Sequence, residues 1–174
     1  GGIVYSGVGF SPNIFENVLF QNNGIARNFS NFGGAINLGI QGADVAINNC
    51  TFYNNLGSSD IRSEGGFFNN NYAGNNIEIT NSIFYESVQN SSRLAITAVQ
   101  ISDPLAKDSI YINHCIFNED TATSLSQSSD TINFWTINNV FENTDPLFID
   151  PLNNNFDLSP SSPAIDSGDP NSPL

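Results

Sequence analysis

The 174-residue chain has no methionine, one tryptophan, two cysteines and only four basic residues. The shortage of basic residues excludes some classes of binding partner. The basic residues stand against 17 acidic ones, which gives a formal net charge of −13. Nucleic acid and anionic membrane surfaces repel such a protein, so neither is an expected partner. No apolar run approaches the length of a membrane span, and we expect no insertion into a bilayer.

Polar character comes mainly from uncharged side chains. Charged residues make up 12% of the chain, whereas asparagine alone supplies roughly one residue in six. This profile is typical of a secreted or cell-surface protein. The chain begins on a strand-like Gly-Gly-Ile, and we expect it to be the C-terminal part of a longer protein, folded as one domain over residues 1–174.

Short motifs recur along the chain every 32 or 33 residues. A Gly-Gly pair appears at Gly1, Gly33 and Gly65. A second motif recurs at the same spacing. It starts at Asn17, Asn49, Asn81 and His114 and ends three residues later at Phe20, Phe52, Phe84 and Phe117. A shortened copy starts at Asn138. Two motifs in step at this period indicate an architecture of stacked repeats.

Each repeat contains three short strand-like stretches separated by polar turns. The second and third repeats place them at Gly33–Leu38, Asp44–Ile47, Cys50–Tyr53, Gly65–Phe68, Asn76–Ile79 and Ser82–Tyr85. Apolar and polar residues alternate within them, and helical periodicity is absent. Such a unit cannot bury its apolar row alone. We therefore predict an all-β coil of parallel strands, a solenoid about five rungs tall, formed by residues 1–144.

The polar residue that starts the second motif lies where the chain bends between two strands. Asparagine tolerates left-handed backbone geometry, and its amide can bond the equivalent residues above and below. We predict a structural ladder of Asn17, Asn49, Asn81 and Asn138, in which His114 replaces one amide. A catalytic or metal-binding role for His114 stays open. The phenylalanine row is predicted to stack in the core.

The two cysteines are predicted to be free thiols. Cys50 and Cys115 occupy the same repeat position two repeats apart, which separates them by roughly 9–10 Å at the usual strand spacing. Bridged cysteines need Cα atoms within about 7 Å. Both side chains should therefore pack inside as small apolar groups.

Two segments carry a family resemblance. Gly-Gly-Ala-Ile at Gly33–Ile36 and Ile-Asn-Asn-Cys-Thr-Phe-Tyr-Asn-Asn at Ile47–Asn55 resemble right-handed parallel β-helix proteins of the polymorphic outer-membrane and pectate-lyase-like type. Asp145–Asp150 and Phe156–Gly168 resemble the closing segment of large secreted bacterial β-helix proteins. The resemblance implies a right-handed, single-stranded parallel β-helix that is extracellular or on the cell surface and serves adhesion, surface display or glycan handling.

Residues 145–174 form a proline-rich tail. Its prolines, Pro146, Pro151, Pro160 and Pro163, lack the backbone donors that a sheet requires. We predict that the tail caps the open end of the coil. No such cap precedes Gly1, so the first rung is expected to stack on upstream rungs or on another molecule.

The sequence contains few clusters of residues that are typical of a catalytic site. Hydrolase members of the family place two or three aspartates together on one strand face, and no such pair occurs within a repeat strand here. Lyase members use a basic residue, and the only comparable cluster is Asp103, Lys107 and Asp108. A loop of mixed charge is usually just solvated, so we favour a non-catalytic protein.

Candidate ligand-binding residues are basic or aromatic. Arg27, Arg62 and Arg93 are expected in the loops between repeats, where they could grip an acidic sugar, unless their spacing is accidental. Tyr53, Tyr85 and Tyr111 are predicted to face outward and to stack on sugar rings, although tyrosine is also common on strands. With Lys107, these residues form the candidate site.

The acidic residues of the tail are weak candidates for a calcium site, and no cofactor is expected to be required. Carboxylate oxygens suit calcium, but their spacing matches no known loop and turn formation is the alternative role. These residues are Asp145, Asp150, Asp157, Asp166 and Asp169.

These observations predict an extracellular or cell-surface module for adhesion, glycan or partner binding. A polysaccharide or cell-surface glycan is the expected partner. Two alternatives stay open. One is a fragment of a polysaccharide lyase or glycoside hydrolase. The other is a structural subunit that self-associates through its uncapped N-terminal rung into a filament or stalk.

Overall fold

The computed structural model describes residues 3–5, 13–23, 33–38, 44–55, 59–65, 76–85, 94–100, 109–120, 125–127 and 134–172. Within these ranges the chain consists almost entirely of β-strands and turns, and the short 3-10 helix Pro151–Asn153 is the only helical element. No helix in the same ranges is long and apolar enough to cross a membrane. The prediction of an all-β protein is confirmed.

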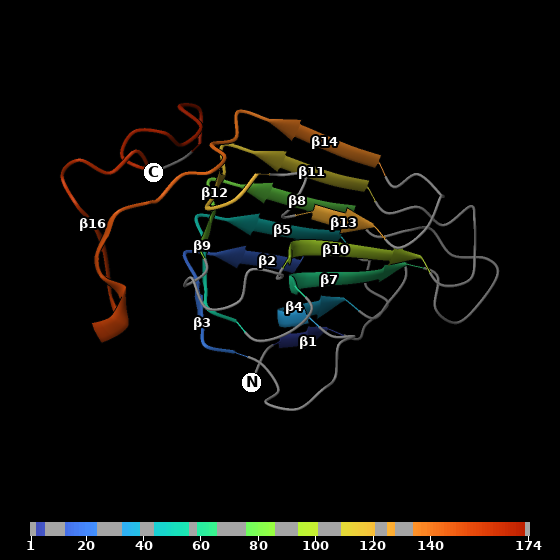
Figure 1. Ribbon diagram of the computed structural model, residues 1–174. Helices are drawn as coiled ribbons and strands as arrows, with labels where there is room; N and C mark the ends of the chain where they lie inside the picture. Colours follow the sequence, from blue (N-terminus) through green and yellow to red (C-terminus); the bar gives the residue numbers. More distant parts are fainter. Residues whose placement is uncertain are drawn as a thin grey trace.

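Three parallel sheets take their strands from the chain in rotation (Figure 1). Sheet A contains β1 (Ile3–Tyr5), β4 (Gly33–Leu38), β7 (Ser59–Gly65), β10 (Leu94–Gln100) and β13 (Leu125–Gln127). Sheet B contains β2 (Asn13–Glu16), β5 (Asp44–Asn48), β8 (Asn76–Thr80), β11 (Ser109–Asn113) and β14 (Phe134–Asn138). Sheet C contains β3 (Leu19–Gln21), β6 (Thr51–Tyr53), β9 (Ile83–Tyr85) and β12 (Ile116–Phe117). Consecutive strands from sheets A, B and C form one repeat unit.

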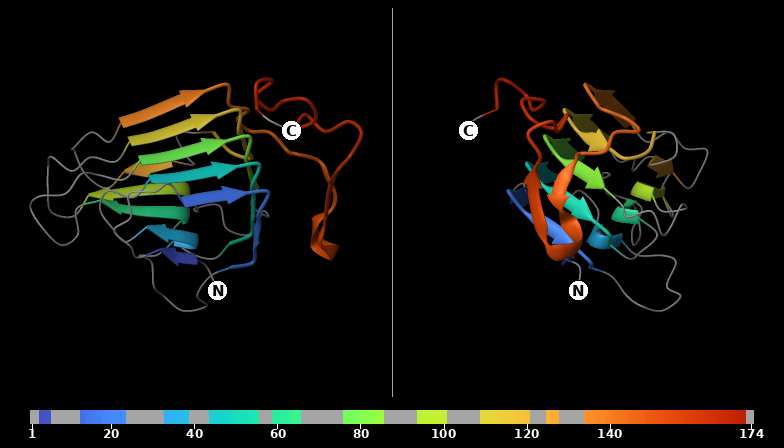
Figure 2. Two further views of the ribbon diagram at one scale, coloured as in Figure 1. Left: turned by 180° about the vertical axis from the view of Figure 1, so that it is seen from behind. Right: turned by 60° about the vertical axis from the view of Figure 1, so that its left-hand side comes forward.

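The strands of sheet B lie one above another in chain order, as Figures 1 and 2 show from opposite sides. Pairing is parallel, and Ala46 lies in register with Glu78, which in turn lies in register with Tyr111. Because side chains alternate between the two faces of a strand, these three residues point outward. Their neighbours point inward, and so equivalent positions in every unit face the same way.

Rows of equivalent apolar side chains fill the core. Ile47, Ile79 and Ile112 are completely buried in one row. The predicted phenylalanine row is confirmed, because its rings stack almost parallel with centroid distances of 4.8, 4.6 and 5.0 Å. The members of this row are Phe20, Phe52, Phe84 and Phe117.

A residue with left-handed backbone geometry follows each strand of sheet B. These residues are Asn17, Asn49, Asn81, His114 and Asn139, with φ values of 57°, 51°, 51°, 51° and 49°. Asparagine suits this position because its short polar side chain can bond locally. The prediction placed Asn138 in the row and is wrong by one residue. Asn138 pairs with Asn113 as the last residue of β14, so the bend falls on Asn139.

Side-chain amides connect neighbouring units along a diagonal. Nδ2 of Asn81 donates to Oδ1 of Asn48 at 2.9 Å, and Nδ2 of Asn139 donates to Oδ1 of Asn113 at 3.0 Å. In both bonds the acceptor precedes the left-handed residue of the adjacent unit. The sequence analysis expected bonds between equivalent asparagines, but the bend carries each amide toward the end of the neighbouring strand.

A second row of asparagines follows sheet C, and the sequence analysis missed it. Nδ2 of Asn54 donates to Oδ1 of Asn22 at 2.7 Å. The buried Asn55 donates to the carbonyl of Phe20 at 3.0 Å and accepts from the backbone N–H of Asn23 at 3.1 Å. The signal was present in the sequence as two Asn-Asn pairs in step with the repeat.

The strands of sheet A do not keep the 32-residue spacing of the Gly-Gly pairs. The strand predicted at Gly65–Phe68 begins earlier, because β7 spans Ser59–Gly65 and residues 66–68 lie outside the described residues. Pairing between β4 and β7 shifts register between Gly33 and Ile36. A bulge of this kind absorbs a change in repeat length without disturbing the neighbouring strands.

The tail forms an antiparallel hairpin of β15 (Phe148–Asp150) and β16 (Asn155–Leu158). It lies beside sheet C (Figures 1 and 2), where Asn154 accepts a hydrogen bond from Gln21 at 2.6 Å. Its rings contact tyrosines of β6 and β9. These contacts are lateral, whereas the sequence analysis expected a cap across the open end. The outward tyrosines of sheet C supply the aromatic surface against which the tail packs.

Replacing Phe84 by alanine should lower the free energy of unfolding by about 3–5 kcal/mol, because it opens a cavity in the middle of the stacked row. Urea denaturation monitored by circular dichroism measures the change. The matched control is Phe141→Ala, since Phe141 is exposed in the last unit. Equal losses in the two variants would show that the row contributes nothing beyond ordinary surface packing.

Candidate functional site

A shallow hollow of about 330 Å³ lies on the outer face of sheet B. Its floor lies over Ala46, because a methyl group leaves space between larger neighbours in the adjacent strands. The outward side chains around it come from β5, β8 and β11, and they are Asp44, Asn76, Glu78, Ser109 and Tyr111.

The chemistry of this hollow is that of a hydrogen-bonding surface beside an aromatic ring. Nδ2 of Asn76 donates to Oδ1 of Asp44 at 2.8 Å, which orients both side chains. Glu78 lies in register between Ala46 and Tyr111. Carboxylates accept hydrogen bonds, amides and hydroxyls both donate and accept, and a phenol adds an apolar face. A ligand with many hydroxyl groups fits this combination.

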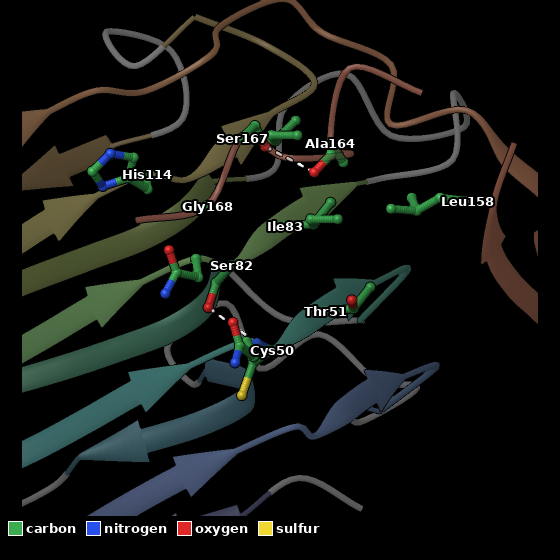
Figure 3. Close-up of a pocket in the computed structure, with 12 residues that line it drawn as sticks. Cys50, Thr51, Ser82, Ile83, His114, Leu158, Ala164, Ser167 and Gly168 are labelled. Atoms are coloured by element: carbon green, nitrogen blue, oxygen red, sulfur yellow. Dashed lines mark hydrogen bonds between the residues drawn. The ribbon is translucent and has the colours of Figure 1, made fainter. Parts of the chain in front are cut away.

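A smaller hollow of about 230 Å³ lies between the left-handed turns and the tail (Figure 3). Ser82 forms part of one wall, where its Oγ accepts the backbone N–H of Cys50 at 3.1 Å. Ser167 lies on the tail side and donates to the carbonyl of Ala164 at 2.9 Å. The hydroxyls of both serines are therefore already used within the protein.

Both cysteines are buried free thiols, as predicted. Each Sγ donates to the carbonyl two residues earlier at 3.3 Å. Ser82 occupies the equivalent position in the unit between them. Burial raises the pKa of Cys115 to about 12 and also raises the pKa of Cys50. Both therefore stay protonated at neutral pH and are poor nucleophiles and metal ligands.

His114 takes the backbone role that the asparagines take in the other units. Its φ of 51° matches Asn81. Its Nδ1 atom is buried, and no residue in the described part of the chain hydrogen-bonds to it. The imidazole thus fits the bend but does not reproduce the amide bonds of the ladder.

The three candidate tyrosines lie on two different sheets. Tyr111 is half-buried on the outer face of sheet B. Tyr53 and Tyr85 belong to sheet C and stack on each other at 5.9 Å. Only 3% of Tyr53 is exposed, because Phe156 of the tail lies edge-on against it at 5.0 Å. The expectation of an exposed Tyr53 is therefore wrong.

The basic candidates do not contribute a described side chain to either hollow. Arg27, Arg93 and Lys107 lie outside the described residues. Arg62 was expected in a loop, but it lies within β7, in register with Asn37 of β4 and with β10 on the other side. Arg62 lies within a strand because β7 spans Ser59–Gly65, whereas the expected strand began at Gly65.

The tail aspartates mostly stabilise turns. Asp145 and Asp169 each accept a backbone N–H from two residues later, at 2.8 and 2.9 Å. This bond is the largest cause that lowers the pKa of Asp169. Asp150 accepts a side-chain amide at 2.8 Å, while Asp157 and Asp166 are exposed. In the ranges that the structure covers, no three His, Cys, Asp or Glu side chains gather where they could hold a metal ion.

Comparison with known proteins gave no match to a family model, to a curated protein or to a solved structure.

We expect the protein to lose stability as the pH rises above 9, partly because of Cys115. The thiol ionises near its ordinary pKa of 9.0 when unfolded and near 12 when folded, so alkaline pH favours the unfolded state. Urea denaturation at several pH values should give a steeper decline for the wild type than for Cys115→Ala, by at most about 1.4 kcal/mol per pH unit. Parallel declines would contradict the raised pKa.

Proposed function

We propose that this chain is a non-catalytic module, extracellular or on the cell surface, that binds neutral glycans on the outer face of sheet B. The hollow beside Tyr111 is the observation that carries the proposal. There Glu78 and the hydrogen-bonded pair of Asp44 and Asn76 line the hollow together with the small side chain of Ala46. The asparagine-rich composition, with only four basic residues, supports an extracellular location.

We also propose that the three sheets form one right-handed parallel β-helix. The strands enter sheets A, B and C in rotation, and each pairs in parallel with its equivalent in the next unit. A coil of this kind explains why apolar rows face a shared core. Right-handed connections between parallel strands are strongly preferred, which supports the hand that the family resemblance implies.

The charge of the face favours neutral ligands. Asp44, Glu78 and Glu16 are strand residues of sheet B on its outward positions, and the whole chain carries a net charge of −13. An acidic polysaccharide would be repelled. Neutral sugar hydroxyls can donate to the carboxylates, and hydrogen bonds to charged acceptors are stronger than neutral ones.

The proposal predicts that Glu78→Gln and Tyr111→Ala each weaken binding to a neutral polysaccharide by about tenfold, through loss of a charged acceptor and of an aromatic face. Affinity electrophoresis against a panel of neutral and acidic polysaccharides measures retention. The same samples are analysed for polymer length, with and without calcium. Retention without shortening is the expected result.

Two controls separate the face of sheet B from general effects. Asp157→Asn removes one negative charge from the exposed tail, and Leu152→Ala removes an exposed apolar side chain there. Both should bind as the wild type does. Shortening of a polymer would contradict the non-catalytic function. Equal losses in the controls would contradict the assignment to sheet B.

A second candidate function is structural, and the exposure of the last unit favours it. Ile137 occupies the row of Ile47, Ile79 and Ile112, yet it is 37% exposed whereas those residues are completely buried. Phe141 beside it is also exposed. In the described part of the chain, β14 pairs only with β11. An open strand with apolar neighbours is a site where another copy could stack.

If copies stack through this end, the sedimentation coefficient should rise with protein concentration. Ile137→Lys should abolish the rise, because a buried charge without a partner is costly. Leu152→Ala in the tail is the control and should leave self-association unchanged. A sedimentation coefficient independent of concentration would exclude this assembly.

A further inference from the structure

The tail segment 145–172, which we call the strap, is hydrogen-bonded mainly to itself. Its two strands pair with each other, and Ser159 N–H donates to the carbonyl of Leu147 at 2.9 Å. The N–H of Ser162 donates to the carbonyl of Ser159 at 2.9 Å, and the N–H of Ile165 donates to the carbonyl of Ser162 at 3.3 Å. Among the described residues, no backbone–backbone hydrogen bond joins the strap to a sheet. The strap can therefore separate from the sheets without breaking any sheet hydrogen bond.

The strap docks mainly through aromatic rings on the outer face of sheet C. Phe156 lies edge-on against Tyr53 at 5.0 Å, and Phe148 lies edge-on against Tyr85 at 5.8 Å. The two tyrosines, which we call the tyrosine strip, stack on each other with an interplanar angle of 17°. Each ring pair of this kind adds only modestly to the stabilisation that its buried area provides.

Three polar contacts join the strap to the rest of the chain. Asn154 in the hairpin turn accepts from Nε2 of Gln21 at 2.6 Å. Near the end of the strap, the backbone N–H of Asp169 donates to Oδ1 of Asn81 at 2.7 Å, and Nδ2 of Asn81 donates to Oγ of Ser172 at 3.2 Å. The hollow of about 230 Å³ lies between them, bounded on the strap side by Ala164 and Gly168 (Figure 3). The strap is therefore not in packed contact with the turns across this hollow.

We propose that the strap opens as a unit and that the tyrosine strip beneath it is a second binding site for neutral sugar rings. The strip lies on sheet C, apart from the hollow on sheet B. Tyr53 and Tyr85 stack in step with the units and supply two apolar rings, each with a hydroxyl at its edge. Phe148 and Phe156 make T-shaped contacts with these rings in the closed state and so compete with a sugar.

Native-state hydrogen exchange on the full chain tests the opening. The backbone N–H groups of Ser159 and Ile165 report on the strap, while those of Ile83 and Ile116 report on sheet C. Strap groups should exchange through a smaller opening that needs less free energy than global unfolding. If strap and sheet groups exchange only together, the proposal is wrong.

The second measurement tests the binding site in the Glu78→Gln background, where the face of sheet B contributes little. Adding Phe148→Ala and Phe156→Ala leaves the tyrosine strip intact and favours the open state. Calorimetric titration with cellohexaose, a neutral hexasaccharide, should then show at least about tenfold tighter binding, because the cost of opening is removed. Leu152→Ala in the same background is the control and should change nothing.

The outcomes are separable from those of the sheet B proposal, which is tested with the strap intact. Faster exchange of the strap together with tighter cellohexaose binding supports the second site. Unchanged binding in the open variant overturns it, even where the strap opens. Faster exchange of Ile83 in the open variant would show that sheet C itself has loosened, and this result also overturns the proposal.

Discussion

The backbone hydrogen bond at each bend is the interaction on which the rest of the structure depends. The N–H of Asn17 donates to the carbonyl of Asn48, and that of Asn81 donates to the carbonyl of Asn113, both at 3.1 Å. Asn49 makes the same kind of bond to the carbonyl of Thr80 at 3.3 Å, so these left-handed residues bind the end of a strand in the next unit. Since side chains alternate along a strand, a slip of one residue would turn Glu78 inward and Ile79 outward. The bend therefore fixes which residues face the core.

The two candidate binding surfaces follow from that register. On sheet B, the outward position next to the buried isoleucine row passes from Ala46 to Glu78 to Tyr111, so a small, an acidic and an aromatic residue come to lie side by side. On sheet C the same rule aligns Tyr53 with Tyr85. Neither surface requires a special loop, because the repeat itself brings residues from distant parts of the sequence into one column.

The sequence predicted the features that the repeat copies and missed those that interrupt it. The phenylalanine row and the free thiols could be predicted because they recur at a fixed period. The last bend was misplaced onto Asn138 because the final repeat is shortened, and both Asn138 and Asn139 suit a bend. The burial of Tyr53 could not be predicted, since its cover, Phe156, belongs to the tail and no periodic pattern relates the two. The hollow on sheet B needed the register of three strands.

The hairpin geometry of the tail explains how it can cover a sheet without becoming part of it. An antiparallel hairpin already pairs its own backbone groups, and Pro146 before its first strand and Pro151 directly after that strand lack backbone donors. It therefore contacts sheet C through side chains alone. Burial beneath it is the first cause that raises the pKa of Tyr85, and nearby Asp145 adds to the effect. Because side-chain contacts can break while every sheet hydrogen bond stays intact, the parallel core stays in register whether the tail is docked or open.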